Sequence, residues 1–288
     1  MLLIALPKPS YFAIPEVFSK SRIATLVDWA STSFNNTNVQ INNNILLITI
    51  EREAKMNALN IDTLQEIKTA VEAAQDNSEV HGIILTGSGT KAFAAGADIA
   101  EFADFGVAEG TKMSADGHQV MNTLERSTKP VIAAVNGFAL GGGCELAMAC
   151  HLRIASTNAK MGQPEVNLGV PPGYGGTQRL VQLIGKSRAL HLLMTADAID
   201  ANTALSYGLV NEVVEQDALL ARCEAVLTKI TGKSPNAVRL VIECVNAHFA
   251  EGEDGMEREI KEFGAAFGTS DFKEGTKAFL NREKPVFR

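Results

Sequence analysis

This sequence predicts an α/β core followed by a helical C-terminal part. Short β-branched runs, such as residues 131–136, alternate with stretches of helical spacing, such as residues 62–74. From Asp217 onward nearly the whole chain has helical spacing. With 288 residues, of which 46% are hydrophobic, the chain is long enough to bury a large core. Strands mixed with helices, and then helices alone, favour an α/β layer with a helical appendage.

The first predicted element is a β-hairpin. Residues 39–42 and 45–51 alternate between apolar and polar, and Asn43-Asn44 between them suits a two-residue turn. A helix over 62–74 comes next, because its apolar residues recur every three or four positions. The remaining elements are predicted in this order: a strand over 82–85, a helix over 113–125, a strand over 131–136, a helix beginning at Gly141, a strand over 153–155, helices over 177–184 and 187–195, a strand over 210–214, and helices over 236–250 and 255–267.

Three regions are therefore expected along the chain. Residues 37–230 form the α/β core, and residues 231–288 form the helical C-terminal region. Residues 1–36 form an N-terminal extension that is disordered or loosely attached. The charged pairs and scattered phenylalanines of the C-terminal region suit a solvated helix pack or an oligomer contact equally well.

The N-terminal extension carries no clear targeting signal. Its first apolar run stops at Pro7, which makes it too short for a secretory signal. Arg22 is its only arginine, so a mitochondrial presequence has little support but stays open. We expect a cytoplasmic location, with the mitochondrial matrix as the alternative.

Charge and composition exclude several classes of function. A formal net charge of −7 argues against a nucleic-acid binder that neutralises phosphates. No membrane span is expected, because the apolar run 131–150 contains Asn136, Glu145 and four glycines that would be costly in lipid. The four cysteines show neither a CxxC pair nor metal-ligand spacing, which indicates buried, reduced thiols and no metal.

A run of three glycines between a strand and a helix is the main pointer to chemistry. Gly141, Gly142 and Gly143 let the backbone approach a ligand closely and direct its N–H groups outward. A helix that opens there adds the positive end of its dipole, so developing negative charge would be stabilised. Glu145 falls in the first turn of this helix. Amides beside a carboxylate suggest oxyanion chemistry with an acid or a base.

A second free amide is expected near Gly96. Small residues over 93–97 let the chain pass close to a ligand, and Asp98 is expected to cap a helix that starts there. This segment offers an amide that could pair with that of Gly142.

Each of these signals also has an ordinary structural interpretation. A glutamate in a first helical turn, such as Glu145, is commonly a charge that stabilises the helix N-terminus. Glu165 lies in a proline-containing turn and, taken alone, reads as a surface cap. The spacing Gly87-x-Gly89-x-x-Ala92 matches the dinucleotide fingerprint, but neither the helix nor the acidic strand end that the fingerprint needs follows it.

Taken together and in order, these segments resemble the crotonase, or enoyl-CoA hydratase, superfamily. The resemblance extends from about Val39 to the C-terminus. It is carried by Met56-Asn57-Ala58-Leu59-Asn60, by the segment from Lys91 to Ile99, by Lys129-Pro130 and the strand that follows, by the segment from Ala139 to Leu146, by Gly162-Gln163-Pro164-Glu165, by the segment from Gly173 to Leu180, and by Tyr207-Gly208-Leu209-Val210.

The resemblance implies a spiral of ββα units with a helical C-terminal trimerisation region. It also implies a homohexamer built as a dimer of trimers, an acyl-CoA substrate, and no cofactor, since coenzyme A is part of the substrate. A thioester oxygen would lie between the N–H groups of Ala97 and Gly142, and Glu145 and Glu165 would be the catalytic pair. The substrate-binding positions implied are Ala95, Ala97, Asp98, Ile99, Ala100, Gly142 and Gly173.

Physical chemistry suggests how the two glutamates divide their roles. Two close carboxylates titrate as a pair, so one tends to stay protonated near neutral pH. The nearby helix N-terminus favours ionised Glu145, which would activate water, while protonated Glu165 would deliver a proton to C2. These roles exchange in dehydration.

The sequence thus predicts a short- or medium-chain enoyl-CoA hydratase, a hydro-lyase of fatty-acid or related acyl-CoA metabolism. An enoyl-CoA isomerase or another lyase on the same scaffold is the alternative within the superfamily. A non-catalytic or RNA-associated scaffold is the alternative outside it, and the glutamate pair and the net charge of −7 speak against it. His151 stands where the superfamily usually has aspartate, and a structural role is expected for it.

Overall fold

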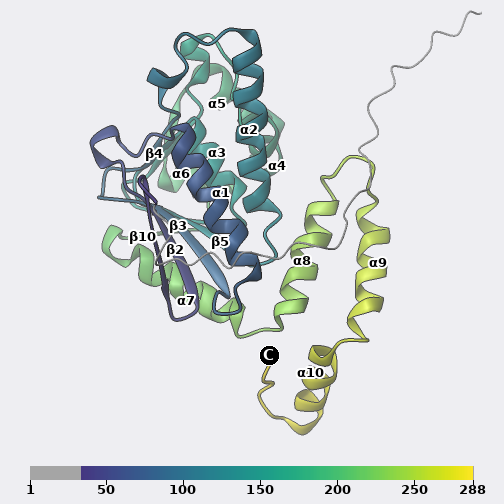
Figure 1. The fold of residues 1–288 in the computed structure, drawn as a ribbon. Coiled ribbons are helices and arrows are strands. Elements are labelled where there is room, and N and C mark those ends of the chain that lie inside the picture. The colour runs from purple at the N-terminus through teal and green to yellow at the C-terminus, as the bar shows by residue number, and fades with distance from the viewer. Residues whose placement is uncertain (1–33, 288) are drawn as a thin grey trace, which may run out of the picture.

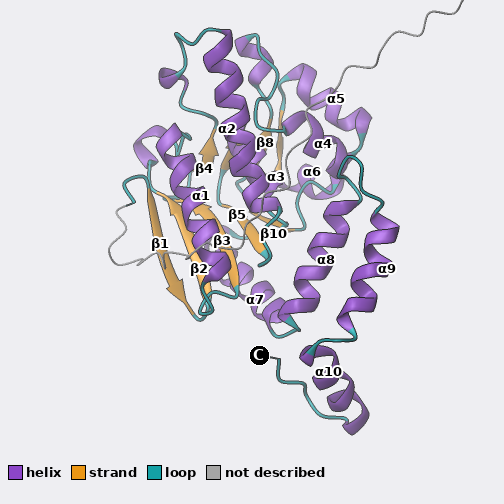
Figure 2. Ribbon diagram, turned by 45° about the vertical axis from the view of Figure 1, so that its right-hand side comes forward, coloured by secondary structure: helices purple, strands orange, loops and turns teal. Residues whose placement is uncertain are grey.

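The computed structural model describes residues 34–287, which form two sheets surrounded by helices (Figures 1 and 2). The predicted N-terminal extension over residues 1–36 lies almost entirely outside these residues. The mixed α/β architecture with helices at its C-terminal end confirms the predicted fold class.

The first sheet has six strands in the order β1-β2-β3-β5-β7-β10. These strands are β1 (Thr37–Asn42), β2 (Ile45–Ile50), β3 (Gly82–Gly87), β5 (Val131–Val135), β7 (Leu152–Ser156) and β10 (Glu212–Val214). Only β1 and β2 pair in antiparallel fashion, and the hairpin turn is at Asn43-Asn44, as predicted. Both asparagines have positive φ, 51° and 64°, which is the geometry of a two-residue turn that follows the strand twist.

The second sheet is smaller and has four strands. It consists of β4 (Ala92–Ala95), β6 (Phe138–Leu140), β8 (Lys160–Gly162) and β9 (Ala198–Asp200). In three successive units, a strand of the first sheet is followed by a strand of the second and then by a helix, as in β3-β4-α2, β5-β6-α3 and β7-β8-α4. These are the ββα units that the resemblance implied.

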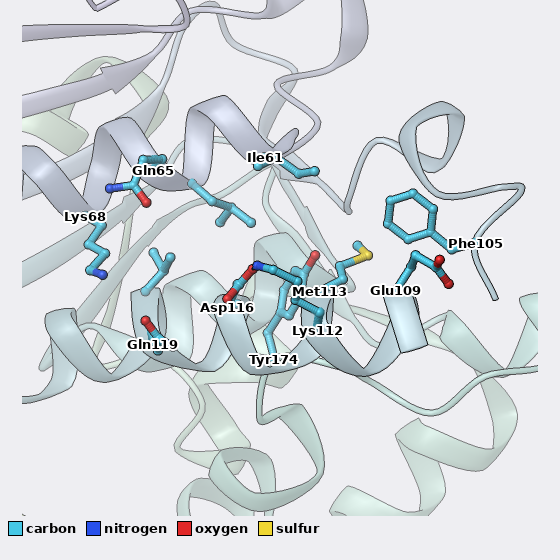
Figure 3. Close-up of a pocket in the computed structure, with 13 residues that line it drawn as sticks. Ile61, Gln65, Lys68, Phe105, Glu109, Lys112, Met113, Asp116, Gln119 and Tyr174 are labelled. Atoms are coloured by element: carbon cyan, nitrogen blue, oxygen red, sulfur yellow. The ribbon is translucent and has the colours of Figure 1, made fainter. Parts of the chain in front are cut away.

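Two long helices, α1 (Ile61–Asp76) and α2 (Val107–Glu125), pack side by side over the sheets (Figure 1). The sequence placed the start of α2 six residues too late, at Met113. It starts earlier because Gly106 is its N-cap and donates its N–H to the Glu109 carboxylate at 3.1 Å. A pocket of about 450 Å³, called here the α1–α2 pocket, lies between the two helices (Figure 3).

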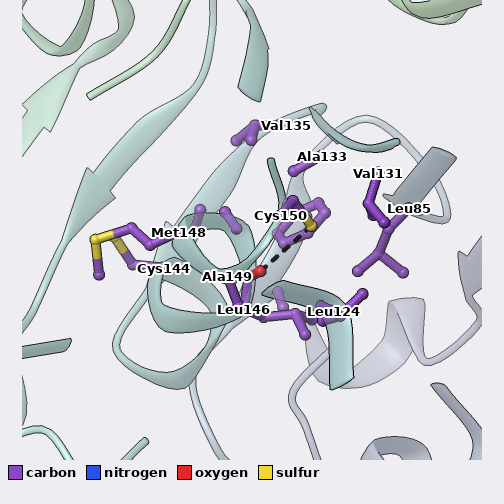
Figure 4. Packing of buried hydrophobic residues seen from close by; sticks show 14 of the residues in the cluster. Leu85, Leu124, Val131, Ala133, Val135, Cys144, Leu146, Met148, Ala149 and Cys150 are labelled. Atoms are coloured by element: carbon purple, nitrogen blue, oxygen red, sulfur yellow. Dashed lines mark hydrogen bonds between the residues drawn. The ribbon is translucent and has the colours of Figure 1, made fainter. Parts of the chain in front are cut away.

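Helix α3 (Gly142–Ala149) is buried along its whole length. Its residues pack with Val131, Ala133 and Val135, which point to one face of the first sheet (Figure 4). The Cys150 thiol, one of four free thiols, donates to the Leu146 carbonyl at 3.5 Å. Helix α7 (Leu219–Thr231) covers the opposite face of the sheet, where Ile132 packs with Leu227. A parallel sheet covered on both faces explains the continuous apolar run of β5.

The short helices α4 (Gly176–Ile184), α5 (Lys186–Thr195) and α6 (Ala201–Tyr207) surround the second sheet. The C-terminal helices α8 (Pro235–Ala247), α9 (Gly255–Ala266) and α10 (Ser270–Asn281) extend away from both sheets (Figure 1). Large apolar side chains are exposed on these three helices and their connections: Val241, Val245, Phe249, Met256, Ile260, Phe263, Phe267, Phe279 and Leu280. No helix within residues 34–287 is both long and apolar enough to cross a membrane.

His151 connects the start of β5 to the end of α2. Its Nδ1 accepts the N–H of Val131 at 3.0 Å, and its Nε2 lies 3.1 Å from the Glu125 carbonyl. Because Nδ1 accepts, the ring is neutral and Nε2 carries the hydrogen. Burial lowers the pKa of His151, which agrees with a neutral ring. These contacts give His151 the structural role expected of it.

Candidate active site

A cavity of about 590 Å³, called here the catalytic cavity, opens beside the second sheet. Its walls come from the end of β4, the N-terminus of α3, one side of α2 and the loop between β8 and α4. Both predicted catalytic glutamates line it. Two side chains that are 20 positions apart in the sequence therefore face one space.

The glycine run makes a sharp strand-to-helix turn. Gly141 has φ +50° and ψ −126°, a conformation that side chains rarely adopt. A Cβ on Gly143 would lie 1.9 Å from the Ala94 carbonyl oxygen, so α3 can approach β4 only with glycine there. Gly142 is consequently the first residue of α3, and its N–H has no acceptor in the preceding turn.

The loop after β4 presents a second N–H in the same place. Leu59 donates to the Gly96 carbonyl and accepts from the Asp98 N–H, both at 2.8 Å, which holds the backbone of Ala97 between them. Ala97 N lies 3.5 Å from the point that a Cβ on Gly142 would occupy. In the part of the chain that the structure describes, neither Ala97 N nor Gly142 N donates to a protein acceptor.

Glu145 is buried in the wall of the catalytic cavity, with 1% of the residue exposed. Its Oε1 accepts the N–H groups of Tyr174 and Gly176, both at 2.7 Å. Gly176 is the first residue of α4, so the carboxylate is held at the N-terminus of α4. Glu145 also falls in the first turn of α3, as the sequence predicted. Burial raises the pKa of Glu145, and the two N–H donors limit that rise.

Glu165 begins the short 3-10 helix Glu165–Leu168 and faces the same cavity. Burial, to which the charge of Glu145 adds, raises the pKa of Glu165 to about 7. The Gln163 side chain is buried. In the orientation that satisfies both ends of its amide, its N–H groups donate to the two Glu165 carboxyl oxygens, with N···O distances of 2.9 and 3.1 Å. The role of Gln163 was not predicted from the sequence, although its position directly before Pro164 and Glu165 is a signal for it.

Most of the other predicted site residues line the cavity, namely Ala95, Ala97, Ile99, Gly142 and Gly173. Ser114 of α2 fixes the Gly173 peptide by donating to its carbonyl at 2.6 Å. Asp98 and Ala100 do not line the cavity.

The predicted helix cap at Asp98 was wrong. The 3-10 helix Ile99–Glu101 has no side-chain cap, because the Asp98 carboxylate turns toward Arg52 and pairs with it at 2.8 Å. The Arg52 guanidinium lowers the pKa of Asp98. The contact of Asp98 and Ala100 with coenzyme A stays a prediction.

Helix α3, which carries Gly142 and Glu145, is held at its other end by a buried arginine. Arg153 has no carboxylate partner in the described residues and donates instead to main-chain carbonyls, at 2.7 Å to Cys150 and 2.8 Å to Leu209. Backbone carbonyls at a helix C-terminus need such donors.

Arg153→Met is expected to lower the free energy of unfolding by about 3 kcal/mol, because the buried carbonyls lose their donors. Denaturant unfolding at fixed protein concentration measures it. Arg222→Met is the control: Arg222 is exposed and pairs with Glu212 on the surface, so its loss should cost less than about 1 kcal/mol. Equal losses in both variants would contradict the role given to Arg153.

The geometry defines a class of enzyme that holds a carbonyl oxygen between two main-chain N–H groups and acts on the adjacent carbons with two carboxyl groups. In the described residues, no group of three or more His, Cys, Asp or Glu side chains is placed to hold a metal ion.

Comparison with known proteins gives the family. Residues 40–288 match the family described as enoyl-CoA hydratase/isomerase, and the chain belongs to this family. A crotonyl-CoA hydratase of Syntrophomonas wolfei is 49% identical over 244 residues, covering 84% of this chain and 94% of the relative. A short-chain-enoyl-CoA hydratase of Clostridium acetobutylicum is 45% identical over 251 residues, covering 87% and 96%.

Solved structures agree with this assignment. A crystal structure of an enoyl-CoA hydratase from Bacillus anthracis matches with a TM-score of 0.83 and 36% identity, over 88% of this chain and 99% of that one. One from Geobacillus kaustophilus matches with a TM-score of 0.84 and 41% identity, over 89% and 99%. The resemblance drawn from the sequence is thereby confirmed.

Proposed function

We propose that this chain catalyses the reversible addition of water to a trans-2-enoyl-CoA, giving a 3-hydroxyacyl-CoA, with Glu145 and Glu165 as its acid–base pair. The observation that carries the proposal is the placement of both carboxyl groups in one cavity with two unpaired N–H groups, those of Ala97 and Gly142. Relatives named as hydratases, at 45–49% identity, support the reaction type.

The two N–H groups stabilise the charge that develops on the thioester oxygen. When water adds at C3, the C2=C3 electron pair moves toward the carbonyl, and the oxygen becomes an enolate oxyanion. Ala97 N–H and Gly142 N–H meet it without reorganisation, because both are fixed by the backbone. Gly142 also contributes the positive end of the α3 dipole.

Glu145 is the base that activates water. Two N–H bonds to its Oε1 favour the ionised form and leave Oε2 to accept a proton. As the C3–O bond forms, the water proton passes to Glu145. Glu165, which keeps a proton near neutral pH, delivers it to C2, and the electron pair returns from the oxygen to complete the C2–H bond. In dehydration each group takes the opposite role.

We further propose a short-chain acyl-CoA as the substrate, with no cofactor beyond the coenzyme A that it carries. The exposed apolar side chains of α8, α9 and α10 support assembly into the predicted homohexamer, a dimer of trimers. We also propose a core at 37–230 and a helical region at 231–288, and the end of α7 at Thr231 supports a boundary near this position. The cytoplasm is the proposed location.

The reaction is tested with crotonyl-CoA and the purified protein. Hydration is measured as the loss of the enoyl thioester absorbance. A 3-enoyl-CoA is assayed in parallel, since the family includes isomerases, and salt-dependent RNA retention is measured on the same preparation. Hydration without RNA retention is expected. Double-bond migration without hydration would favour the isomerase, and RNA retention without either activity would favour a scaffold.

The pH dependence of the reaction follows from the need for one proton on the pair. Forward and reverse reactions start from states with the same total number of protons, so their pH profiles must coincide. With the pKa of Glu165 at about 7, kcat/KM in either direction is expected to fall roughly tenfold per pH unit above pH 7. Initial rates in both directions from pH 5.5 to pH 9 check it. A flat profile across pH 7 to 9 would contradict the proton placement.

A further inference from the structure

The side chain of Tyr174 stands between two cavities. It lines the catalytic cavity, and it also lines the α1–α2 pocket on the other side; Met113 is the one other residue that these two linings share. Figure 3 shows Tyr174 beside Met113 at the wall that α2 provides. The two cavities measure about 590 and 450 Å³. Helix α2 lines both cavities, with Gly110 and Ser114 on the catalytic cavity and Gly117 and Val120 on the α1–α2 pocket, and the side chains of Tyr174 and Met113 lie where the two linings meet.

The Tyr174 ring fills the gap between α2 and α3. A Cβ on Gly117 of α2 would lie 2.1 and 2.3 Å from Cδ1 and Cε1 of the ring, so this edge rests directly on the helix backbone. A Cβ on Gly142 of α3 would lie 3.3 and 3.4 Å from Cε2 and Cδ2, on the opposite edge. The ring thus reaches from a helix that borders the α1–α2 pocket to the N–H proposed to bind the thioester oxygen.

The backbone of Tyr174 is fixed at both ends, so the ring has a defined position. Its N–H donates to Glu145, and its carbonyl accepts from Arg179 at 3.1 Å. Arg179 is itself held by the carboxylate of Glu125 in α2, with distances of 2.7 and 3.2 Å. Charge-assisted bonds of this kind restrict movement of the loop relative to α2.

The α1–α2 pocket has the character of a site for an aliphatic chain. Apolar side chains line it, among them Ile61, Leu64 and Val120, and charged side chains also line it, namely half-buried Lys68 and exposed Glu109, Lys112 and Asp116. Transfer of methylene groups from water into an apolar space is favourable.

We propose that Tyr174, with Met113, is the partition that ends the acyl pocket and restricts the enzyme to short acyl chains, and that the α1–α2 pocket is the space a longer chain enters when the ring is removed. This inference rests on the proposed function. In this proposal the carbons beyond C3 extend past Glu145 and Gly142 toward the Tyr174 ring, which packs against Gly142.

The test compares kcat/KM for C4 and C12 trans-2-enoyl-CoA esters in wild type, Tyr174→Ala and Tyr174→Phe. Tyr174→Ala is expected to raise the C12/C4 ratio at least tenfold, because the two cavities then connect. Tyr174→Phe keeps the ring and should leave the ratio within twofold of wild type. An unchanged ratio in a folded Tyr174→Ala protein overturns the proposal, and so does an equal rise in Tyr174→Phe.

Two further variants complete the test. One identifies where the longer acyl chain binds, and the other replaces Tyr174→Ala if that variant does not fold. Gln119 is exposed at the pocket edge, so adding Gln119→Trp to Tyr174→Ala should block the pocket and return the ratio toward the wild-type value. Tyr174→Leu retains more apolar volume and is used if the alanine variant does not fold; the same direction is expected. A ratio that Gln119→Trp does not reduce would place the chain elsewhere and overturn the assignment of the pocket.

A binding measurement separates this inference from the proposed function. Calorimetric titration with saturated butanoyl-CoA and dodecanoyl-CoA needs no turnover. Tyr174→Ala should strengthen dodecanoyl-CoA binding relative to butanoyl-CoA, while wild type should not favour the longer chain. If wild type binds both esters but hydrates no enoyl-CoA, the proposed reaction fails and the partition is still tested; if Tyr174→Ala leaves the preference unchanged, the partition fails alone.

Discussion

Glu145→Gln and Glu165→Gln are each expected to lower kcat for hydration of crotonyl-CoA by roughly 100- to 10,000-fold. Glutamine keeps the size of the side chain but can neither take the proton from water nor deliver one to C2. Steady-state rates and the binding of a saturated acyl-CoA are measured on the same preparations. The dissociation constant should change by less than about fivefold, because the N–H groups of Ala97 and Gly142 remain in place.

Glu224→Gln is the matched control for this pair. Glu224 is exposed on α7 and does not line the catalytic cavity. Its replacement should leave kcat unchanged. Near-normal turnover in both Glu145→Gln and Glu165→Gln would refute the acid–base scheme, and a large loss in Glu224→Gln would show that the rate loss is not specific to the site.

Gly142→Pro is expected to lower kcat by roughly 100- to 1,000-fold, corresponding to about 3–4 kcal/mol of transition-state stabilisation. Proline removes one of the two N–H groups that meet the oxyanion. The first residue of an α-helix tolerates proline, since its N–H has no intrahelical acceptor. The change therefore removes a catalytic donor at a place where the helix does not need it. Single-turnover rates with crotonyl-CoA measure the effect.

Gly142→Ala separates the missing N–H from the added side-chain atoms. It keeps the donor and adds a Cβ that would lie 3.3 Å from Tyr174 Cε2, so a smaller loss is expected. Circular dichroism should show both variants folded. If Gly142→Ala and Gly142→Pro lose activity equally, steric crowding and not the lost donor accounts for the effect.

Elements with a strong local pattern could be predicted from the sequence. The hairpin has a two-residue turn at Asn43-Asn44 between two alternating runs, and the apolar run of β5 is too short for an ordinary helix. Strands β6, β8 and β9 were not identified as strands, because each has only three residues and no visible alternation. Their pairing partners are distant in the sequence, so local periodicity does not encode them.

Only those parts of the site that depend on local sequence could be predicted. The two glutamates and the glycine turn were found because their motifs are contiguous. The donors to Glu145 were not identified, because Tyr174 and Gly176 lie about 30 positions further along the chain. Asp98 was expected to cap a helix, yet Arg52, 46 positions away, offered its carboxylate a stronger partner.

The neutral ring of His151 makes the fold sensitive to acidification. The ordinary pKa of 6.5 applies in the unfolded chain, whereas burial lowers the value in the folded one. Unfolding therefore takes up a proton at mildly acidic pH, and the stabilising contribution of His151, present above pH 6.5, is lost as the pH falls. A charged ring could no longer accept the Val131 N–H, so acidification would weaken the link between the start of β5 and the end of α2.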